Sequence, residues 1–320
     1  MRELSVSAAA LLALALAAAA GNNARAIMGG EDAATSDIGA RATVFIEAPG
    51  YFCSGAIYGD SFVLTAAHCL VDFAGKPTAE AKDLKIIYGG NPLDPKAPIR
   101  RATRLVVHDH YIKQVQKFFS EAPGPREFAD EPINQEDVAI IRVDGGHPEG
   151  TLGVELADID NEYVFRGVPR LRLSPLLWMD VYGFGAIVEG HRPVLRKLRV
   201  NSVTPDYVRA GQEPVPGQFY FPRQIMVRPE DFNSGEGIRK TWGICHGDSG
   251  GPSFFVAAST AKTTPTTAIK LVKGRPLLIG LTSHGRLDAH MPNENCAQSL
   301  YMMRVDYYRE WFLAQIKQMR

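Results

Sequence analysis

The sequence predicts an all-β protein with the architecture of a β-sandwich or a β-barrel. From residue 27 onward, short runs rich in β-branched and aromatic residues alternate with glycine, proline, asparagine and aspartate, the pattern of strands joined by turns. Many short strands with few helical patterns are typical of sandwiches and barrels. The chain has 320 residues, 45% hydrophobic and 22% charged, which is enough to bury one or two cores.

The individual elements follow from local patterns. One helix is expected after Asp306, whose carboxylate can cap its first turn. Four apolar residues recur there at helical spacing: Tyr308, Trp311, Phe312 and Ile316. The expected strands are residues 43–46, 62–65, 84–88, 138–143, 181–184, 198–200 and 277–282. Three segments are interpreted as long loops: 114–132, 257–273 and 286–295.

The first 26 residues predict a secretory signal. Arg2 precedes an apolar run at residues 8–20, and small residues with two Ala-x-Ala sites follow it. A retained membrane anchor is the alternative, but the run is shorter than the roughly 20 residues of a spanning helix. Cleavage after Ala26 would expose Ile27, whereas cleavage after Ala20 would leave a short pro-segment, residues 21–26. We therefore expect a secreted or periplasmic protein that does not bind the membrane after signal removal.

Charge and cysteine content narrow the function classes. The formal net charge is zero, so there is no electrostatic case for binding nucleic acid or anionic membranes. Four cysteines in an exported protein allow three disulfide pairings, and spacing alone does not choose between them. No Cys-x-x-Cys pair is present, which argues against a zinc site. We expect no metal and no cofactor.

Three short motifs predict nucleophilic catalysis. His68 lies in Thr-Ala-Ala-His-Cys, Asp137 begins Asp-Val-Ala-Ile-Ile, and Ser249 lies in Gly-Asp-Ser-Gly-Gly. A serine hydroxyl attacks only when an imidazole takes its proton, and a carboxylate fixes the tautomer of that imidazole. Glu136 and Asp130 are weaker alternatives for the acid. The backbone N–H groups of Gly247 and Ser249 can bind the oxyanion.

Two other function classes stay open. The motif around Ser249 also satisfies Gly-x-Ser-x-Gly, the nucleophile elbow of α/β-hydrolases, which would make the protein a secreted esterase. That fold needs a helix after the serine, but Pro252 and the strand-like residues behind it do not favour one. A binding protein that keeps the fold of such an enzyme without its activity would be expected to lack His68, Asp137 or Ser249, and none of the three is missing.

These motifs resemble those of the trypsin/chymotrypsin-like serine proteases. Further matches are Ile-Met-Gly-Gly at 27–30, Val-His-Asp-His-Tyr at 107–111, Thr-Ser-His-Gly at 282–285 and Arg-Val at 304–305. The resemblance covers residues 27–320 and implies two six-stranded antiparallel β-barrels with the active site in the cleft between them. The implied boundaries are about 27–150 for the first barrel, about 151–305 for the second and about 306–320 for a C-terminal helix.

The resemblance also implies pairings and roles. The disulfides would be Cys53–Cys69 and Cys245–Cys296. The α-ammonium of Ile27 would pair with Asp248. His108 and His110 suggest a metal pair, but their register makes them surface or packing residues. The implied substrate-binding residues are Gly243, Ile244, His246, Ser283, His284, Gly285 and Leu300, with Ser299 as the alternative to Leu300.

The implied partners are protein or peptide substrates, and the implied state is a monomer. Gly243 stands at the floor of the implied specificity pocket, where an aspartate would favour cleavage after arginine or lysine. Without that charge, and with Leu300 on the wall, we expect cleavage after uncharged residues of small to medium size. The loop 286–295 borders this pocket.

Overall fold

The computed structural model describes residues 27–72, 74–121, 136–158, 178–185, 193–201, 224–227, 243–257, 268–286, 296–297 and 299–320. The expected signal, residues 1–26, lies outside the described residues. So do Asp130 and most of the three expected long loops, namely 122–132, 258–267 and 287–295.

The first half is a closed antiparallel barrel, which confirms the predicted fold class. Its strands, in the order in which they pair, are β2 (Thr43–Ala48), β3 (Tyr51–Tyr58), β4 (Phe62–Thr65), β7 (Ala139–Val143), β6 (Ile99–Val107) and β5 (Lys85–Tyr88). Successive side chains on a strand point to opposite faces, and the barrel follows this rule. Val44 and Ile46 belong to one buried cluster, whereas Phe45 between them belongs to another.

The second half is built on a ten-stranded sheet. Six of its strands pair in the order β10-β9-β13-β16-β18-β11. Among the described residues, β11 and β10 do not pair with each other, so these six strands do not form a closed barrel. The bounds along it are β10 (Arg196–Asn201), β9 (Trp178–Gly183), β13 (Pro252–Ala257), β16 (Arg275–Arg286), β18 (Ser299–Arg304) and β11 (Gln224–Val227). The short strands are β1 (Glu31–Asp32), β8 (Glu155–Leu156), β14 (Ala268–Ile269) and β15 (Leu271–Val272), with β12 (Ile244–Cys245) paired separately to β17 (Cys296–Ala297).

The expected C-terminal helix is α4 (Val305–Met319), and the prediction of this helix is confirmed. Tyr308, Phe312 and Ile316 are buried on one face. The prediction of Asp306 as its cap is wrong, because the N-cap residue is Arg304 and no side chain caps the helix. Asp306 lies in the first turn instead and accepts a hydrogen bond of 3.1 Å from Arg304 Nε.

Other helices and strands were not expected from the sequence. Residues 109–121 form α3 (Asp109–Glu121), so the loop expected from residue 114 begins at least eight residues too early. Tyr111 and Val115, each 1% exposed, hold this helix on the barrel. Part of the loop expected at 257–273 forms β14 and β15. The short elements α2 (Ile38–Arg41), η1 (Ala67–Cys69) and η2 (Ala81–Asp83) complete the fold.

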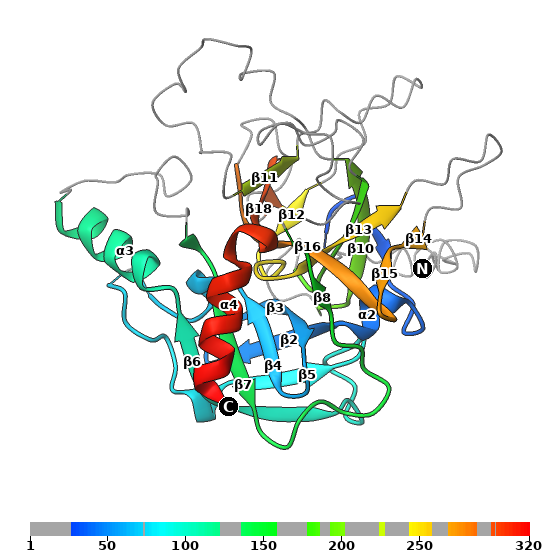
Figure 1. The fold of residues 1–320 in the computed structure, drawn as a ribbon, viewed down its shortest axis with the longest axis horizontal. Helices are drawn as coiled ribbons and strands as arrows, with labels where there is room; N and C mark the ends of the chain where they lie inside the picture. Colours follow the sequence, from blue (N-terminus) through cyan, green and yellow to red (C-terminus); the bar gives the residue numbers. More distant parts are fainter. Residues whose placement is uncertain are drawn as a thin grey trace, which may run out of the picture.

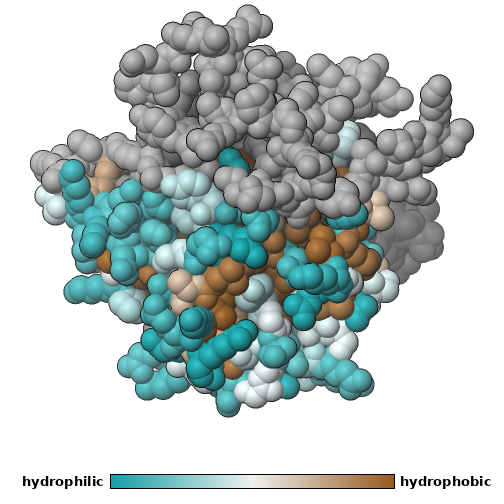
Figure 2. Space-filling model, viewed as in Figure 1, coloured by the Kyte–Doolittle hydropathy of each residue, from teal (hydrophilic) through white to brown (hydrophobic). Residues whose placement is uncertain are grey.

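One buried cluster joins the two halves to α4. It contains Phe45 of β2, Phe254 of β13 and Phe312 of α4. In Figure 1, α4 runs beside the barrel strands β6 and β7, and Arg142 Nη1 of β7 donates a hydrogen bond of 2.6 Å to the carbonyl of Met319. Figure 2 shows hydrophobic surface near α4 and near β15 and β16, surrounded by hydrophilic residues. No helix among the described residues has the length and apolarity needed to cross a membrane.

Candidate active site

His68 lies on η1, directly after β4, where the chain leaves the barrel. Ala66 and Ala67 before it are fully buried, and their small side chains let this turn pack against the barrel. The backbone N–H of His68 donates to Asp137 Oδ1 at 2.8 Å, and its ring Nδ1 lies 2.7 Å from Asp137 Oδ2. The imidazole is thus held at two points by one carboxylate.

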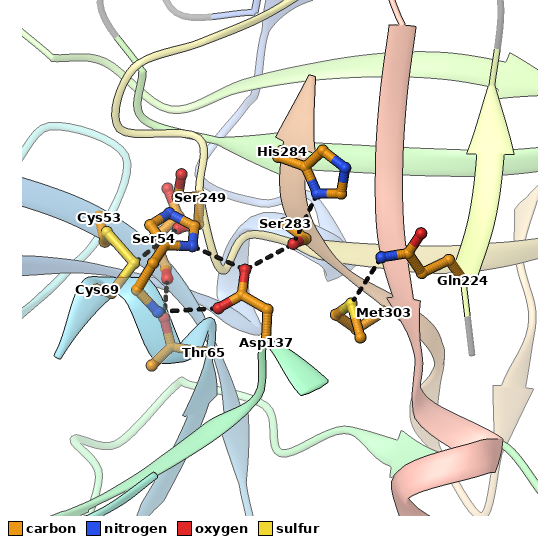
Figure 3. A network of polar contacts seen from close by, with 11 residues as sticks. Cys53, Ser54, Thr65, Cys69, Asp137, Gln224, Ser249, Ser283, His284 and Met303 are labelled. Carbon is orange, nitrogen blue, oxygen red and sulfur yellow. Dashed lines mark hydrogen bonds and ion pairs between the residues drawn. A yellow bond between two sulfur atoms is a disulfide. The ribbon is translucent and has the colours of Figure 1, made fainter. Parts of the chain in front are cut away.

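Asp137 lies two residues before β7, with 0% of its surface exposed. Ser283, on β16 of the second half, donates its hydroxyl to Asp137 Oδ2 at 2.6 Å. Figure 3 shows this carboxylate between its partners from the two halves. A buried carboxylate is costly unless it is hydrogen-bonded, and here three donors satisfy it.

These contacts shift two pKa values in opposite directions. Burial raises the pKa of Asp137, but the charge of His68 and the hydrogen bonds from His68 and Ser283 outweigh it, so the pKa lies below its usual value. Burial lowers the pKa of His68, but the charge and hydrogen bond of Asp137 raise it above 6.5. Asp137 is therefore the anion that holds His68, which is the state that its predicted role needs.

Ser249 lies on a tight loop between β12 and β13. Its carbonyl accepts a hydrogen bond of 2.8 Å from the N–H of Ser54 in β3, and it lies 3.8 Å from the sulfur of Cys69. The next residue, Gly250, donates its N–H to the carbonyl of Thr282 at 2.7 Å. Figure 3 shows Ser249 beside the Cys53–Cys69 disulfide. The loop is thus fixed to both halves, next to the turn that carries His68.

Two glycines in this loop have positive φ, which side chains rarely adopt. At Gly247, φ is 96°, and a Cβ would lie 2.0 Å from a ring atom of Phe52. At Gly250, φ is 77°, and a Cβ would lie 2.0 Å from Thr65 Oγ1. Both positions require glycine. The N–H groups of Gly247 and Ser249 make no hydrogen bond to another described residue.

Ser54 is a site residue that the sequence analysis missed. It is fully buried, and its hydroxyl donates to the carbonyl of Gly247 at 2.8 Å while accepting the N–H of Phe184 at 3.0 Å. Thr65 Oγ1 donates to the carbonyl of Ser54 at 2.8 Å. The one sequence signal was a serine within the otherwise apolar strand that follows Cys53.

Asp248 is fully buried beside the first described residue, Ile27, which is also fully buried. Asp248 accepts N–H groups from Gly185 and Cys245, each at 2.7 Å. It also accepts the backbone N–H of Ile27. Burial raises its pKa to about 6, although these hydrogen bonds oppose the rise. The structure therefore brings together the two residues expected to form an ion pair.

Arg196 holds the segment around Ile27, and the sequence analysis did not single it out. Its guanidinium donates to the carbonyl of Ile27 at 2.8 Å and to the carbonyl of Gly30. Arg196 Nε also lies 3.2 Å from Asp32 Oδ1. The charge of Arg196 favours the ionised form of Asp248.

The expected pocket residues fall into two groups. Ile244 and Leu300 are buried in one apolar cluster, and Leu300 pairs in register with Gly285. Gly243, also buried, donates its N–H to the carbonyl of Met28 at 3.0 Å. His246 is exposed. Ser283 and His284 lie beside Asp137 rather than in the apolar cluster. Ser283 donates a hydrogen bond to Asp137, and His284 Nδ1 lies within hydrogen-bond distance of Ser283 Oγ.

The alternatives for acid and metal take other positions. Glu136 Oε2 lies 3.9 Å from His108 Nε2, whereas the carboxylate that contacts the His68 ring is that of Asp137. His108 packs on Trp311, with ring centroids 4.9 Å apart, while His110 is exposed. Among the described residues, the possible ligand atoms of Cys53, His68 and Cys69 lie close enough together to hold a metal ion, but the two sulfurs form a disulfide.

A comparison with known families adds to this geometry. Residues 27–312 match the family model described as Trypsin. The chain belongs to the trypsin family. This membership supports a serine protease of the chymotrypsin type that acts on proteins or peptides.

Other features agree with trypsin-family membership. The structure contains the two disulfides that the resemblance implied, Cys53–Cys69 and Cys245–Cys296. Disulfides and this fold indicate an extracellular protein. After Ser249 the chain enters strand β13, whereas the nucleophile elbow of an α/β-hydrolase leads into a helix.

Proposed function

We propose that this protein is an exported serine endopeptidase with Ser249 as nucleophile, His68 as general base and Asp137 as the orienting acid. The observation that supports this most strongly is the buried carboxylate of Asp137, 2.7 Å from His68 Nδ1. Because an ionised carboxylate only accepts hydrogen bonds, Nδ1 carries the proton. Nε2 of the neutral ring is then left with the lone pair that a base needs.

The proposed reaction has two halves. Ser249 Oγ attacks the scissile carbonyl, and His68 Nε2 takes its proton; the N–H groups of Gly247 and Ser249 stabilise the oxyanion. His68 then gives the proton to the leaving amine, and an acyl-enzyme forms on Ser249. A water molecule, deprotonated by His68, then attacks the acyl carbon; the acid product leaves, and His68 returns the proton to Ser249 Oγ.

For specificity, we propose cleavage after uncharged residues of small to medium size. Gly243 offers no charge, and the apolar side chains of Ile244 and Leu300 are buried together where the resemblance expects the pocket. Incubation with a diverse peptide mixture, followed by mass spectrometry of the products, tests this. Cleavage mainly after arginine or lysine would contradict it.

The nucleophile is tested by labelling. A fluorophosphonate should add one group to Ser249 and abolish hydrolysis, and Ser249→Ala should lower kcat by about a million-fold, as for a triad that works as a unit. Ser61→Ala, in the turn between β3 and β4, is the control and should keep full activity. Undiminished peptidase activity in Ser249→Ala would refute the proposal, and activity on esters without activity on peptide amides would favour the esterase.

Maturation is part of the proposal. We propose that signal peptidase cuts after Ala26, so that the new α-ammonium of Ile27 pairs with Asp248 without a separate pro-segment. The buried positions of Ile27 and Asp248 support this. N-terminal sequencing of the secreted protein tests it: an inactive chain that begins at Gly21 would contradict direct activation.

A further inference from the structure

A second imidazole lies on the far side of Asp137 from His68. His284 Nδ1 is 3.1 Å from Ser283 Oγ, and Ser283 Oγ is 2.6 Å from Asp137 Oδ2. Figure 3 shows the dashed contacts that connect His284 through Ser283 to Asp137. Together with the bond from Asp137 to His68, these contacts form a continuous series of four side chains.

The proton count along this series fixes the direction of each hydrogen bond. The Ser283 hydroxyl has one proton, and the Asp137 carboxylate can only accept. The proton of Ser283 therefore lies toward Asp137, and the oxygen of Ser283 accepts from His284. This assigns the proton of the neutral His284 ring to Nδ1.

The surroundings of His284 keep this arrangement fixed. Its ring stacks on Tyr301, with centroids 4.6 Å apart and planes only 6° from parallel, which sets the direction of Nδ1. The pKa of His284 is lowered to about 3, mainly by burial; the charge of Asp137 opposes this shift, and the charge of His68 adds to it. The ring thus stays neutral at the pH values where a histidine base works.

We propose that His284 is a positioning residue for the triad: by donating from Nδ1, it holds the Ser283 hydroxyl in the orientation that bonds Asp137. The inference rests on the proposed function. Without His284 the hydroxyl is free to rotate, and Asp137 then loses one of its three donors for part of the time. A carboxylate with weaker hydrogen bonds is more basic and favours the protonated form of His68.

The expected effect of losing Nδ1–H is an upward shift in the pKa that governs the acid limb. We expect His284→Phe, which keeps an aromatic ring against Tyr301, to shift this limb upward by about 0.5 unit. That is about a threefold loss of rate on the acid side of the profile. His284→Asn places an amide N–H near the position of Nδ1 and should keep the profile close to that of the wild type.

The test measures inactivation by a small fluorophosphonate between about pH 5 and 8, a range that spans the ordinary histidine pKa. This reagent has no peptide portion, so it does not contact the wall on which peptide substrates would lie. The same profiles are measured for Ser283→Ala and for Ser283→Ala combined with His284→Phe. If His284 acts through Ser283, the shift caused by His284→Phe disappears in the Ser283→Ala background.

Each outcome decides between the proposals. A wild-type protein that does not react at Ser249 would refute the proposed function itself. If the wild type reacts but His284→Phe has an unchanged profile, or if the shift persists in the Ser283→Ala background, the proposal for His284 is wrong. A change confined to the KM of peptide substrates would also overturn it, because His284 would then only contact substrate. If His284→Phe does not fold, His284→Leu takes its place.

Discussion

Replacement of Ser54 by alanine should loosen the nucleophile loop from the first barrel. The hydroxyl of Ser54 is the partner of two buried backbone groups, the carbonyl of Gly247 and the N–H of Phe184. Leaving a buried polar group unsatisfied costs about 1–3 kcal/mol, so losing both should cost about 2–6 kcal/mol of unfolding free energy. The same change frees Gly247, whose N–H is proposed to bind the oxyanion.

The assay combines stability with activity. Urea denaturation gives the loss of unfolding free energy, and kcat/KM is measured under conditions where both proteins are fully folded. Loss of one oxyanion donor costs about 100- to 1,000-fold in kcat, so a misplaced donor should cost about 10- to 100-fold. The matched control is Thr43→Val, which removes a buried hydroxyl that bonds the carbonyl of Gly39 at 2.7 Å, in another part of the barrel.

The control separates the two effects. Thr43→Val should lower stability by about 1–3 kcal/mol and leave kcat/KM of the folded protein unchanged. If Ser54→Ala lowers stability but also leaves kcat/KM unchanged, Ser54 does not position the loop. If the unfolding free energy and kcat/KM of Ser54→Ala both match those of the wild type, the expected cost of leaving the two backbone groups without the Ser54 hydroxyl is wrong as well.

Two further predictions concern charge. Because the pKa of His68 is raised, kcat/KM should fall as the pH decreases, with a midpoint above about pH 6.5. Asp137→Asn should lower that midpoint. A pH–rate profile measures both midpoints, and a wild-type midpoint below about pH 6 would contradict the raised pKa of His68. The stability from this pair should be complete between the unfolded pKa values of Asp137 and His68; it should fade as the pH rises through the folded pKa of His68 or falls through the folded pKa of Asp137. Arg196→Met should free the segment around Ile27, speed amide exchange at Gly30 and lower activity. Arg199→Met, which breaks the pair with Asp180, is the control and should do neither; unchanged exchange in Arg196→Met would count against the role of Arg196.

The features that the sequence predicts most reliably are those formed by residues close together in the chain. The motifs around His68, Asp137 and Ser249 identified residues that the fold brings to one region. The short strand-like runs separated by turn residues predicted a sandwich or a barrel, and the family resemblance implied barrels. The hydroxyl of Ser54 could not be assigned a role, because its partners Gly247 and Phe184 are more than a hundred residues away. Such contacts are created by the fold and leave no local pattern.

The errors in the helices have a similar cause. Asp306 is a good cap by residue type, but the helix begins at Val305, two residues earlier than expected, and the carboxylate of Asp306 accepts a hydrogen bond from Arg304. The sequence predicts a loop where the second part of α3 lies, because residues 114–132 are rich in proline, glutamate and phenylalanine. Its apolar residues Tyr111 and Val115 lie at helical spacing, but the first lies outside the segment that was considered.

The C-terminal helix gives the assembly of this enzyme an order. Each disulfide lies within one half of the molecule, so no covalent cross-link among the four cysteines joins the halves. The contact is noncovalent and includes α4, which follows every described strand in the chain yet packs against the first barrel. A chain that emerges from its N-terminus therefore completes the barrel long before the piece that joins it to the second half arrives. The barrel carries Asp137, whereas Ser249 and Ser283 belong to the second half, so a chain that has folded only its barrel lacks the hydroxyl that completes the hydrogen bonds of Asp137 and also the proposed nucleophile.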